Sequence, residues 1–181
     1  MNKMRLSSRE ITDQAIMEDF LEAMHVGYLG LTDGLEPYVI PLNYVWHQKN
    51  IYFHGASSGR KIEILEKNNQ ACFTVSEELG TMSNPIPAKT DTAYKSVILF
   101  GKVERVEKIT ECTAVMQSLL NKYVPGYYDK PLASSHLERY VSSLGSKTVV
   151  FKLTPEKITG KENNLIEKMK FTPGRTIHMD L

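Results

Sequence analysis

PYVIPLNYVW (residues 37–46) is followed by the polar turn HQKN (47–50) and then by IYFHGASSGRKIEIL (51–65). The apolar, β-branched and aromatic residues on either side of the turn predict two β-strands. The second strand leads through a loop of small residues into a helix that opens with Gly59, Arg60 and Lys61. The stretch therefore predicts a β-hairpin whose second strand is followed directly by a helix.

The start of this helix is a candidate anion site. Small residues let a ligand approach the backbone, and the free N–H groups of a helix start attract anions. Arg60 and Lys61 could be ordinary solvated charges, but cations at this end oppose the helix dipole unless an anion is near. Because the preceding strand offers a surface for a flat ring, the segment predicts a phosphorylated aromatic cofactor.

The totals indicate one soluble globular domain. The 181 residues are 41% hydrophobic and 24% charged, with a formal net charge of +1, which gives no basic field for nucleic acid. We find no apolar run long enough to span a bilayer and no apolar segment of a secretory signal. Cys72 and Cys112 lack CxxC spacing, which favours small core residues over a disulfide and indicates the cytoplasm.

Apolar periodicity predicts three main helices, over residues 12–25, 59–67 and 107–123. In the first, Thr12 is the expected N-cap, and the expected apolar stripe consists of Ile16, Phe20, Leu21 and Met24. A short helix is expected near residues 137–144.

Strands are predicted over residues 26–32, the hairpin 38–54, and residues 71–75, 94–106 and 147–153. A hairpin turn is expected at Asp33-Gly34, a bulge or close backbone approach at Gly101, and a long loop over residues 77–90. The pattern fades after Gly160, so the tail is expected either to pack on a partner or to be partly disordered.

These elements predict a mainly β (α+β) fold. About six strands follow one another through hairpins and do not alternate with helices, which disfavours a parallel Rossmann sheet. An antiparallel, Greek-key-like barrel with helices packed outside fits the order better.

The chain resembles the pyridoxamine 5′-phosphate oxidase-like family of FMN-binding split barrels, and within it the branch of nitroimidazole-resistance (Nim-type) proteins. The residues that carry the resemblance are 37–44, 52–56, 59–61, 94–97, 100–101 and 158–161. The resemblance implies a split β-barrel domain over residues 1–161 with a C-terminal extension, residues 162–181. It also implies a homodimer with FMN at the subunit interface.

Carried onto this sequence, the resemblance implies a set of FMN-binding residues. Arg60 and Lys61 are expected to pair with the phosphate, and backbone groups from Val39 to Asn43 to meet the polar edge of the ring. His54 is expected near the substrate side of the flavin, as the candidate catalytic residue. The full cofactor-binding set is Tyr38, Val39, Ile40, Pro41, Leu42, Asn43, Tyr44, His54, Ser57, Ser58, Gly59, Arg60, Lys61, Tyr94 and Ser96.

Several of these residues also have a structural interpretation. His54 could be a strand-end structural histidine, although an ordinary pKa of about 6.5 suits proton donation. Asn43, if buried in an apolar strand, needs either a ligand or a cross-strand partner. For Tyr94, core packing is as good an interpretation as cofactor contact. The sequence shows no metal-ligand spacing, nucleophile elbow or Walker loop, so no metal site is expected.

The sequence favours a flavin-dependent reductase that passes electrons from a nicotinamide donor, bound transiently, to a small aromatic or nitroaromatic substrate. The alternatives are a non-catalytic FMN-binding or redox-sensing protein, a pyridoxamine phosphate oxidase, and a relative that binds deazaflavin or haem. The oxidase is disfavoured because we see no second cation cluster for a substrate phosphate.

Overall fold

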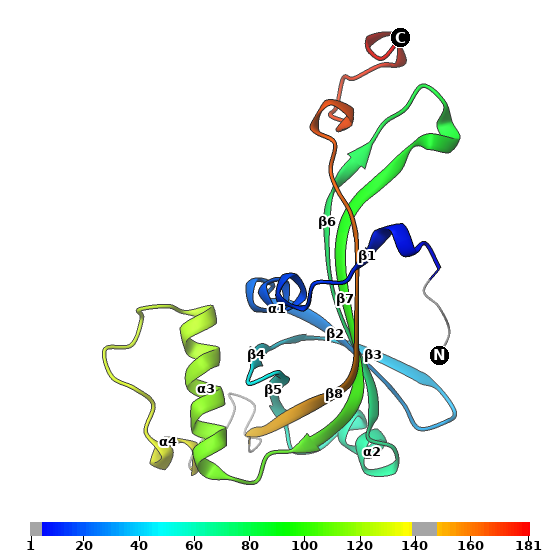
Figure 1. Ribbon diagram of the computed structural model, residues 1–181. Coiled ribbons are helices and arrows are strands. Elements are labelled where there is room, and N and C mark those ends of the chain that lie inside the picture. Colours follow the sequence, from blue (N-terminus) through cyan, green and yellow to red (C-terminus); the bar gives the residue numbers. More distant parts are fainter. Residues whose placement is uncertain (1–4, 139–147) are drawn as a thin grey trace.

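The computed structural model describes residues 5–138 and 148–181 (Figure 1). Its strands are β1 (Glu10–Ile11), β2 (Val26–Thr32), β3 (Pro37–Asn43), β4 (Val45–His47), β5 (Asn50–Ala56), β6 (Gln70–Met82), β7 (Asp91–Arg105) and β8 (Thr148–Asn163). Its α-helices are α1 (Gln14–Ala23), α2 (Arg60–Lys67), α3 (Ile109–Tyr123) and α4 (Ser134–Glu138). Short 3₁₀ helices cover Ser7–Arg9, Pro87–Lys89, Glu167–Met169 and Ile177–Met179.

The strands form one antiparallel eight-stranded sheet in the order β3-β2-β6-β7-β8-β5-β4, with β1 paired to β8. The sheet curls into a half-barrel with helices on its outside (Figure 1). This confirms the predicted split β-barrel. The short strands β1 and β4 bring the number above the six expected.

The chain changes sheet edges at Tyr44. β3 and β4 lie at opposite ends of the sheet order, although this single residue separates them. The predicted hairpin over residues 38–54 is therefore wrong for its first half, because β3 pairs with β2 and only β4 pairs with β5. The turn of the real hairpin has Gln48 and Lys49 at φ 48° and 61°, the twist that a two-residue hairpin loop favours.

Two clusters of buried side chains hold the sheet and helices together. The first fills the half-barrel and includes Phe53, Phe73 and, from α1, Leu21. The second lies between α3 and the outside of the sheet and includes Tyr52, Val115 and Met116, with Leu119 and Val150.

Two details of α1 differ from prediction. Asp13, not Thr12, is the N-cap, and its carboxylate accepts a hydrogen bond from Ala15 N at 2.9 Å. The buried stripe begins at Met17, while Ile16 is 38% exposed. The helix starts one residue later than expected, and the face that it buries consists of Met17, Phe20 and Leu21.

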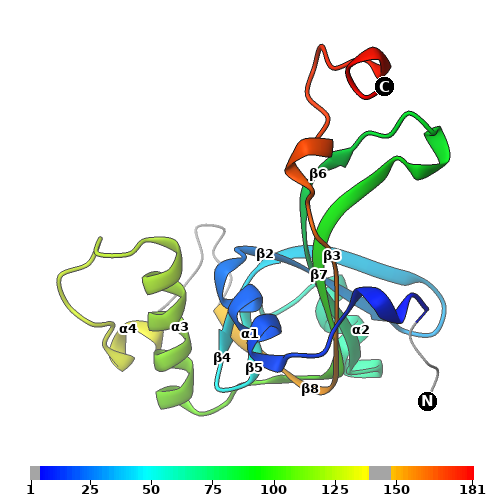
Figure 2. The same ribbon diagram turned by 45° about the horizontal axis from the view of Figure 1, so that its top comes forward.

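The predicted loop over residues 77–90 is strand at its start, because β6 continues to Met82, and it is a loop with a short 3₁₀ helix over residues 83–90 before β7 begins. This half of the hairpin projects beyond the half-barrel (Figure 2), so the polar side chains of Glu77 and Glu78 stay exposed and are compatible with strand pairing. Gly101 sits at a bulge of β7, and a Cβ there would lie 2.0 Å from the Thr154 carbonyl oxygen. The close approach predicted at Gly101 is confirmed.

The C-terminal half also extends further than its pattern indicated. β8 runs to Asn163, ten residues past the predicted end at Leu153. The short helix expected near residues 137–144 begins earlier, at Ser134, and most of the predicted range lies outside the described residues. In the part of the chain that the structure describes, no helix is long and apolar enough to cross a membrane.

Candidate functional site

The loop between β5 and α2 presents an uncapped helix start. Gly59 precedes α2 with φ 102°, in the left-handed region that glycine adopts most easily, and no side chain caps the helix. The Gly59 carbonyl accepts hydrogen bonds from Ile62 N at 2.8 Å and Glu63 N at 3.2 Å. The first N–H groups of the helix therefore face the loop of exposed Ser57 and Ser58, where an anion can bind.

Arg60 joins this helix start to β3. Its guanidinium carbon lies 4.8 Å from the centre of the Tyr38 ring, and one of its nitrogens lies 2.7 Å from the Glu36 carboxylate. The Arg60 and Glu36 side chains are 52% and 73% exposed, and an ion pair this exposed contributes little stability. The guanidinium can thus leave Glu36 and bind an anion of higher charge with little loss of stability.

Lys61 points back over β5. Its ammonium lies 5.5 Å from the centre of the Phe53 ring and 5.0 Å from that of Phe151. Burial lowers the pKa of Lys61. Among the residues that the structure describes, no carboxylate lies within ion-pair distance of this ammonium. A half-buried cation without a counter-charge is unfavourable, and a bound anion would remove that cost.

His54 lies on the opposite face of β5 from this group. Because successive strand residues alternate, His54 shares the face of Tyr52, whereas Phe53 and Gly55 share the other. Its side chain is exposed, yet partial burial, and then the charge of Lys61, lower its pKa. The pKa of His54 thus lies below the ordinary value of about 6.5 on which the expected proton donation is based.

The residues of β3 divide between two faces. Tyr38, Ile40 and Leu42 are half-buried and pack on the core, whereas Val39, Pro41 and Asn43 are exposed on the outside. Asn43 is thus not buried, and the premise that it needs a buried partner is wrong. β3 is the end strand of the sheet, so one of its edges is free to meet the polar edge of a ring.

Tyr44 is a core residue. It is fully buried, and its hydroxyl donates to the Leu21 carbonyl at 2.8 Å. Its N–H donates to the Tyr123 hydroxyl at 2.8 Å. With both polar groups occupied inside the protein, we leave Tyr44 out of the proposed site.

Tyr94 and Ser96 lie on the outside of the sheet. The register places Gly30 opposite Val39 and Cys72, and Cys72 opposite Phe100, so these residues share one face. Alternation along β7 adds the side chains of Ile98, Ser96 and Tyr94 to it. We call this surface the outer sheet face; its exposed apolar side chains are Val26, Tyr28, Val39 and Phe100.

With His54 on the other face of β5 and Tyr44 in the core, the remaining predicted site residues lie mainly in two groups, one around the start of α2 and one on the outer sheet face. The sequence pattern of the pyridoxamine 5′-phosphate oxidase family matches residues 13–162. The chain belongs to this family. No curated protein matches the sequence.

Solved structures share the fold of this family member. A flavocytochrome from Azotobacter vinelandii aligns with a TM-score of 0.76 and 21% identity, covering 91% of this chain and 73% of its own. A proposed 5-nitroimidazole antibiotic resistance protein from Bacteroides thetaiotaomicron aligns with a TM-score of 0.66 and 24% identity, covering 84% and 85%. A FAD- and haem-binding protein from Mycobacterium smegmatis aligns with a TM-score of 0.70 and 15% identity, covering 91% and 76%.

Some residues of the α2 group in this oxidase-family chain were not foreseen. Phe151 reaches Lys61 because β8 places it opposite Phe53, a pairing that no local pattern reveals. Glu36 meets Arg60 only because the β2–β3 hairpin folds beside α2. Gly55 carried a usable signal, since an isolated glycine in a strand indicates close approach of another group.

Proposed function

We propose that this protein binds FMN and acts as a flavin-dependent reductase. The electrons would pass from a nicotinamide donor, NADH or NADPH, to a small aromatic or nitroaromatic substrate. The observation that carries the proposal is the ammonium of Lys61, which lies half-buried beside the uncapped start of α2 with no counter-charge from the described residues 5–138 and 148–181. A phosphate at this position supplies the missing charge, and family membership makes a flavin phosphate the natural one.

The residues present fit such a cofactor. Arg60 and Lys61 would bind the phosphate together with the hydroxyls of Ser57 and Ser58 and the N–H groups that follow Gly59. The ring would lie along β3, whose free edge offers backbone groups from Val39 to Asn43. When bound, a flavin supplies the ability to accept a hydride and to pass electrons on.

A second copy of the chain would complete the site. The outer sheet face exposes Val26 (44%), Tyr28 (46%), Val39 (62%) and Phe100 (43%), and large apolar side chains exposed on one face are typical of protein interfaces. Packing of two such faces would bring Tyr94 and Ser96 to the partner subunit. The two groups of predicted residues would then meet across the interface of a homodimer.

His54 is the candidate for substrate contact. Its side chain is exposed at the end of β5, close enough to Lys61 for that charge to lower its pKa. In the neutral form its imidazole can accept a hydrogen bond from a substrate or orient it. This role differs from the proton donation expected from an unshifted pKa.

FMN and FAD share the ring and the first phosphate, and fold relatives from Mycobacterium smegmatis and Mesorhizobium loti are FAD-binding proteins. We favour FMN because the cations at the start of α2 suit a terminal phosphate dianion. Cys72 and Cys112 are both free, consistent with a reducing compartment such as the cytoplasm.

The double substitution of Arg60 and Lys61 by alanine tests the proposal. FMN content after purification should fall at least ~100-fold while the fold remains intact, since two charge-assisted contacts are lost. The matched control is Lys67→Ala on the same helix, which should keep its FMN. Oxidation of NADH or NADPH with a nitroaromatic acceptor then separates a reductase from a non-catalytic FMN-binding protein.

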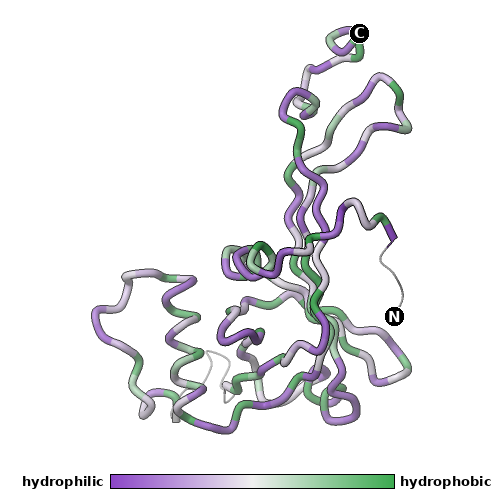
Figure 3. The backbone as a smooth tube through the Cα atoms, in the orientation of Figure 1, coloured by the Kyte–Doolittle hydropathy of each residue, from purple (hydrophilic) through white to green (hydrophobic). Residues whose placement is uncertain are grey.

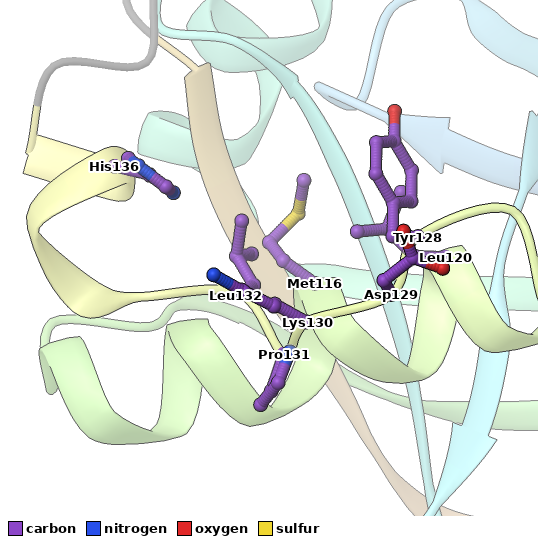
Figure 4. Close-up of a pocket in the computed structure, with 8 residues that line it drawn as sticks. All are labelled: Met116, Leu120, Tyr128, Asp129, Lys130, Pro131, Leu132 and His136. Atoms are coloured by element: carbon purple, nitrogen blue, oxygen red, sulfur yellow. The ribbon is translucent and has the colours of Figure 1, made fainter.

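Haem binding is a second candidate function. A cavity of about 440 Å³ lies between α3, α4 and their connection, away from Arg60 and Lys61, and contains Met116 and His136 among its lining residues (Figure 4). Methionine and histidine are common axial ligands of haem iron, and two fold relatives are a flavocytochrome and a haem-binding protein. A Soret band after addition of haem, abolished by His136→Ala, would support this site.

A further inference from the structure

The β6–β7 hairpin and the C-terminal tail together form a projecting arm. We use this name for residues 76–96 and 164–181. In both views of the fold the arm extends away from the curled sheet, with the C-terminus near its tip (Figures 1 and 2). The tail lies beyond residue 162, where the match to the oxidase family ends.

The tail is fixed to the hairpin of its own chain. Ser83 N donates to the Met169 carbonyl at 2.9 Å, and Phe171 N donates to the Thr81 carbonyl at 2.8 Å. A β-bridge also joins Met82 to Lys170. The tail therefore lies beside the hairpin as a third, strand-like segment.

Further along, the tail is closed by Arg175. Its guanidinium pairs with Asp180 and donates to the carbonyls of Lys168 at 2.7 Å and Lys170 at 2.9 Å. These contacts fold the last residues of the chain back on the tail. The arm is thus a built element rather than a loose extension.

The arm exposes several large apolar side chains among its polar residues. Hydrophobic residues occur at its tip and along the tail (Figure 3). The large apolar side chains exposed there are Ile86 (52%), Ile166 (46%), Phe171 (48%), Ile177 (50%), Met179 (71%) and Leu181 (87%). Gathered on one element, such side chains indicate a surface that another molecule covers.

The exposed area of the chain indicates how much surface a partner can cover. The chain exposes 11588 Å², whereas a compact monomer of its mass exposes about 8,800 Å². The surplus of about 2,800 Å² is somewhat more than the roughly 1,000–2,500 Å² that each subunit of a large obligate homodimer buries, so the chain has enough extra surface for such an interface.

Charge and continuity favour a second copy of this chain over other partners. The arm carries five acidic and five basic side chains, so it has no net charge to attract nucleic acid or an anionic membrane. Its strand β7 also continues directly into the outer sheet face, through Tyr94, Ser96 and Ile98. A partner seated on that face lies next to the arm.

We propose that the arm of each subunit packs on the barrel of a second copy of this chain and interlocks the two subunits. The inference rests on the proposed dimer and extends it, since it assigns the contact to the arm, whose tail lies outside the family's matched region. The apolar side chains of the tail, Ile177 and Met179 foremost, are buried in that contact.

Site-specific photo-crosslinking in the full-length protein tests the contact. Two copies with different affinity tags are co-expressed, one carrying a benzophenone amino acid at position 179. Irradiation should yield a covalent species of twice the chain mass that carries both tags. The same probe at Tyr127, which is 75% exposed but lies off the arm, should yield at least ~10-fold less.

Substitution measures the strength of the contact. Ile177→Glu with Met179→Glu changes only exposed residues, so each subunit should fold, but the dimer dissociation constant should rise roughly 100-fold or more. Tyr127→Glu is the control and should leave the constant unchanged. Sedimentation equilibrium gives the constants.

Three results would overturn the inference. The protein could be a monomer, or position 179 could cross-link only within its own chain or to another protein. The third is a dimer dissociation constant that the two glutamate substitutions leave unchanged. Flavin content of the same samples keeps the two proposals apart. Bound flavin without inter-chain cross-links refutes the arm alone, and cross-links without flavin binding refute the cofactor alone.

Discussion

The ammonium of Lys61 lies where a side chain on Gly55 would begin, because a Cβ built on Gly55 would be 2.3 Å from Nζ. The absence of a side chain at position 55 therefore lets the lysine cross β5 and reach the rings of Phe53 and Phe151. Since the group in the way is the flexible end of a lysine, a small side chain at position 55 would move the ammonium and leave the strand in place.

Gly55→Ala should consequently weaken flavin binding without unfolding the protein. We expect FMN affinity to fall about 10-fold, the effect of weakening one charge-assisted contact. Stability should stay the same or rise by about 0.5 kcal/mol, because alanine is the less flexible residue in a strand. Titration by flavin fluorescence measures the affinity, and thermal unfolding measures the stability. An unchanged FMN affinity would show that Lys61 does not bind the phosphate.

Lys61→Met should have opposite effects on the free and the flavin-bound protein. Without flavin, removal of a half-buried cation that lacks a counter-charge should raise stability or leave it unchanged. With flavin, the loss of a charged contact should weaken affinity about 10- to 100-fold. Thermal unfolding with and without FMN reports both.

The control for this prediction is Lys67→Met, on the same helix. Lys67 is exposed and lies 3.6 Å from the Asp33 carboxylate, so its substitution should affect neither measurement. If Lys67→Met lowered FMN affinity as much as Lys61→Met, the loss of affinity would come from the lower net positive charge of the helix and not from a specific contact of Lys61 with the phosphate.

Local sequence signals predicted the parts of the fold that depend on neighbouring residues. The start of α2 at Gly59, the turn at Asp33-Gly34 and the close approach at Gly101 all follow from the conformational freedom of glycine or from turn preferences. The split barrel followed from strands in sequence without intervening helices.

Long-range pairings could not be predicted in this way. β3 looks like the first strand of a hairpin with β5, and only the chain crossing at Tyr44 sends it to the far edge of the sheet. The same holds for the site, where Phe151 meets Lys61 through a strand pair nearly a hundred residues apart in sequence. Residues 77–82 resemble a loop in sequence because they are mostly polar, contain a glycine and precede two prolines, whereas their strand pairing depends on the distant β7.

His54 should make stability depend on pH. Its folded pKa is lowered, by partial burial and then by Lys61, below the unfolded value of about 6.5. Because the unfolded chain then binds the proton more tightly, stability should fall as pH drops below about 6.5 and through the folded pKa.

The comparison variant for this prediction is His54→Gln, which removes the titrating group. The wild-type protein should lose more stability than the variant between pH 7 and pH 5, as measured by urea unfolding. Equal losses would show that the pKa of His54 does not differ between the folded and unfolded states. In the same variant, FMN should stay bound while substrate reduction slows, if His54 contacts the substrate.

Tyr123→Phe should destabilise the chain crossing at Tyr44. The Tyr123 hydroxyl accepts from Tyr44 N at 2.8 Å and reaches the Tyr44 carbonyl at 3.0 Å and the carbonyl of His25. Loss of this hydroxyl leaves the buried Tyr44 N–H unpaired, which costs about 1–3 kcal/mol. Tyr127→Phe, at an exposed tyrosine, should cost nothing measurable in the same denaturant titration.

The most direct measurement is the visible absorption spectrum of the freshly purified protein, with the released chromophore identified by its mass. Our account predicts the two visible bands of an oxidised flavin and the mass of FMN, released at one molecule per chain. A colourless protein that also fails to bind added FMN would contradict it, and the half-buried charge of Lys61 would then need another partner.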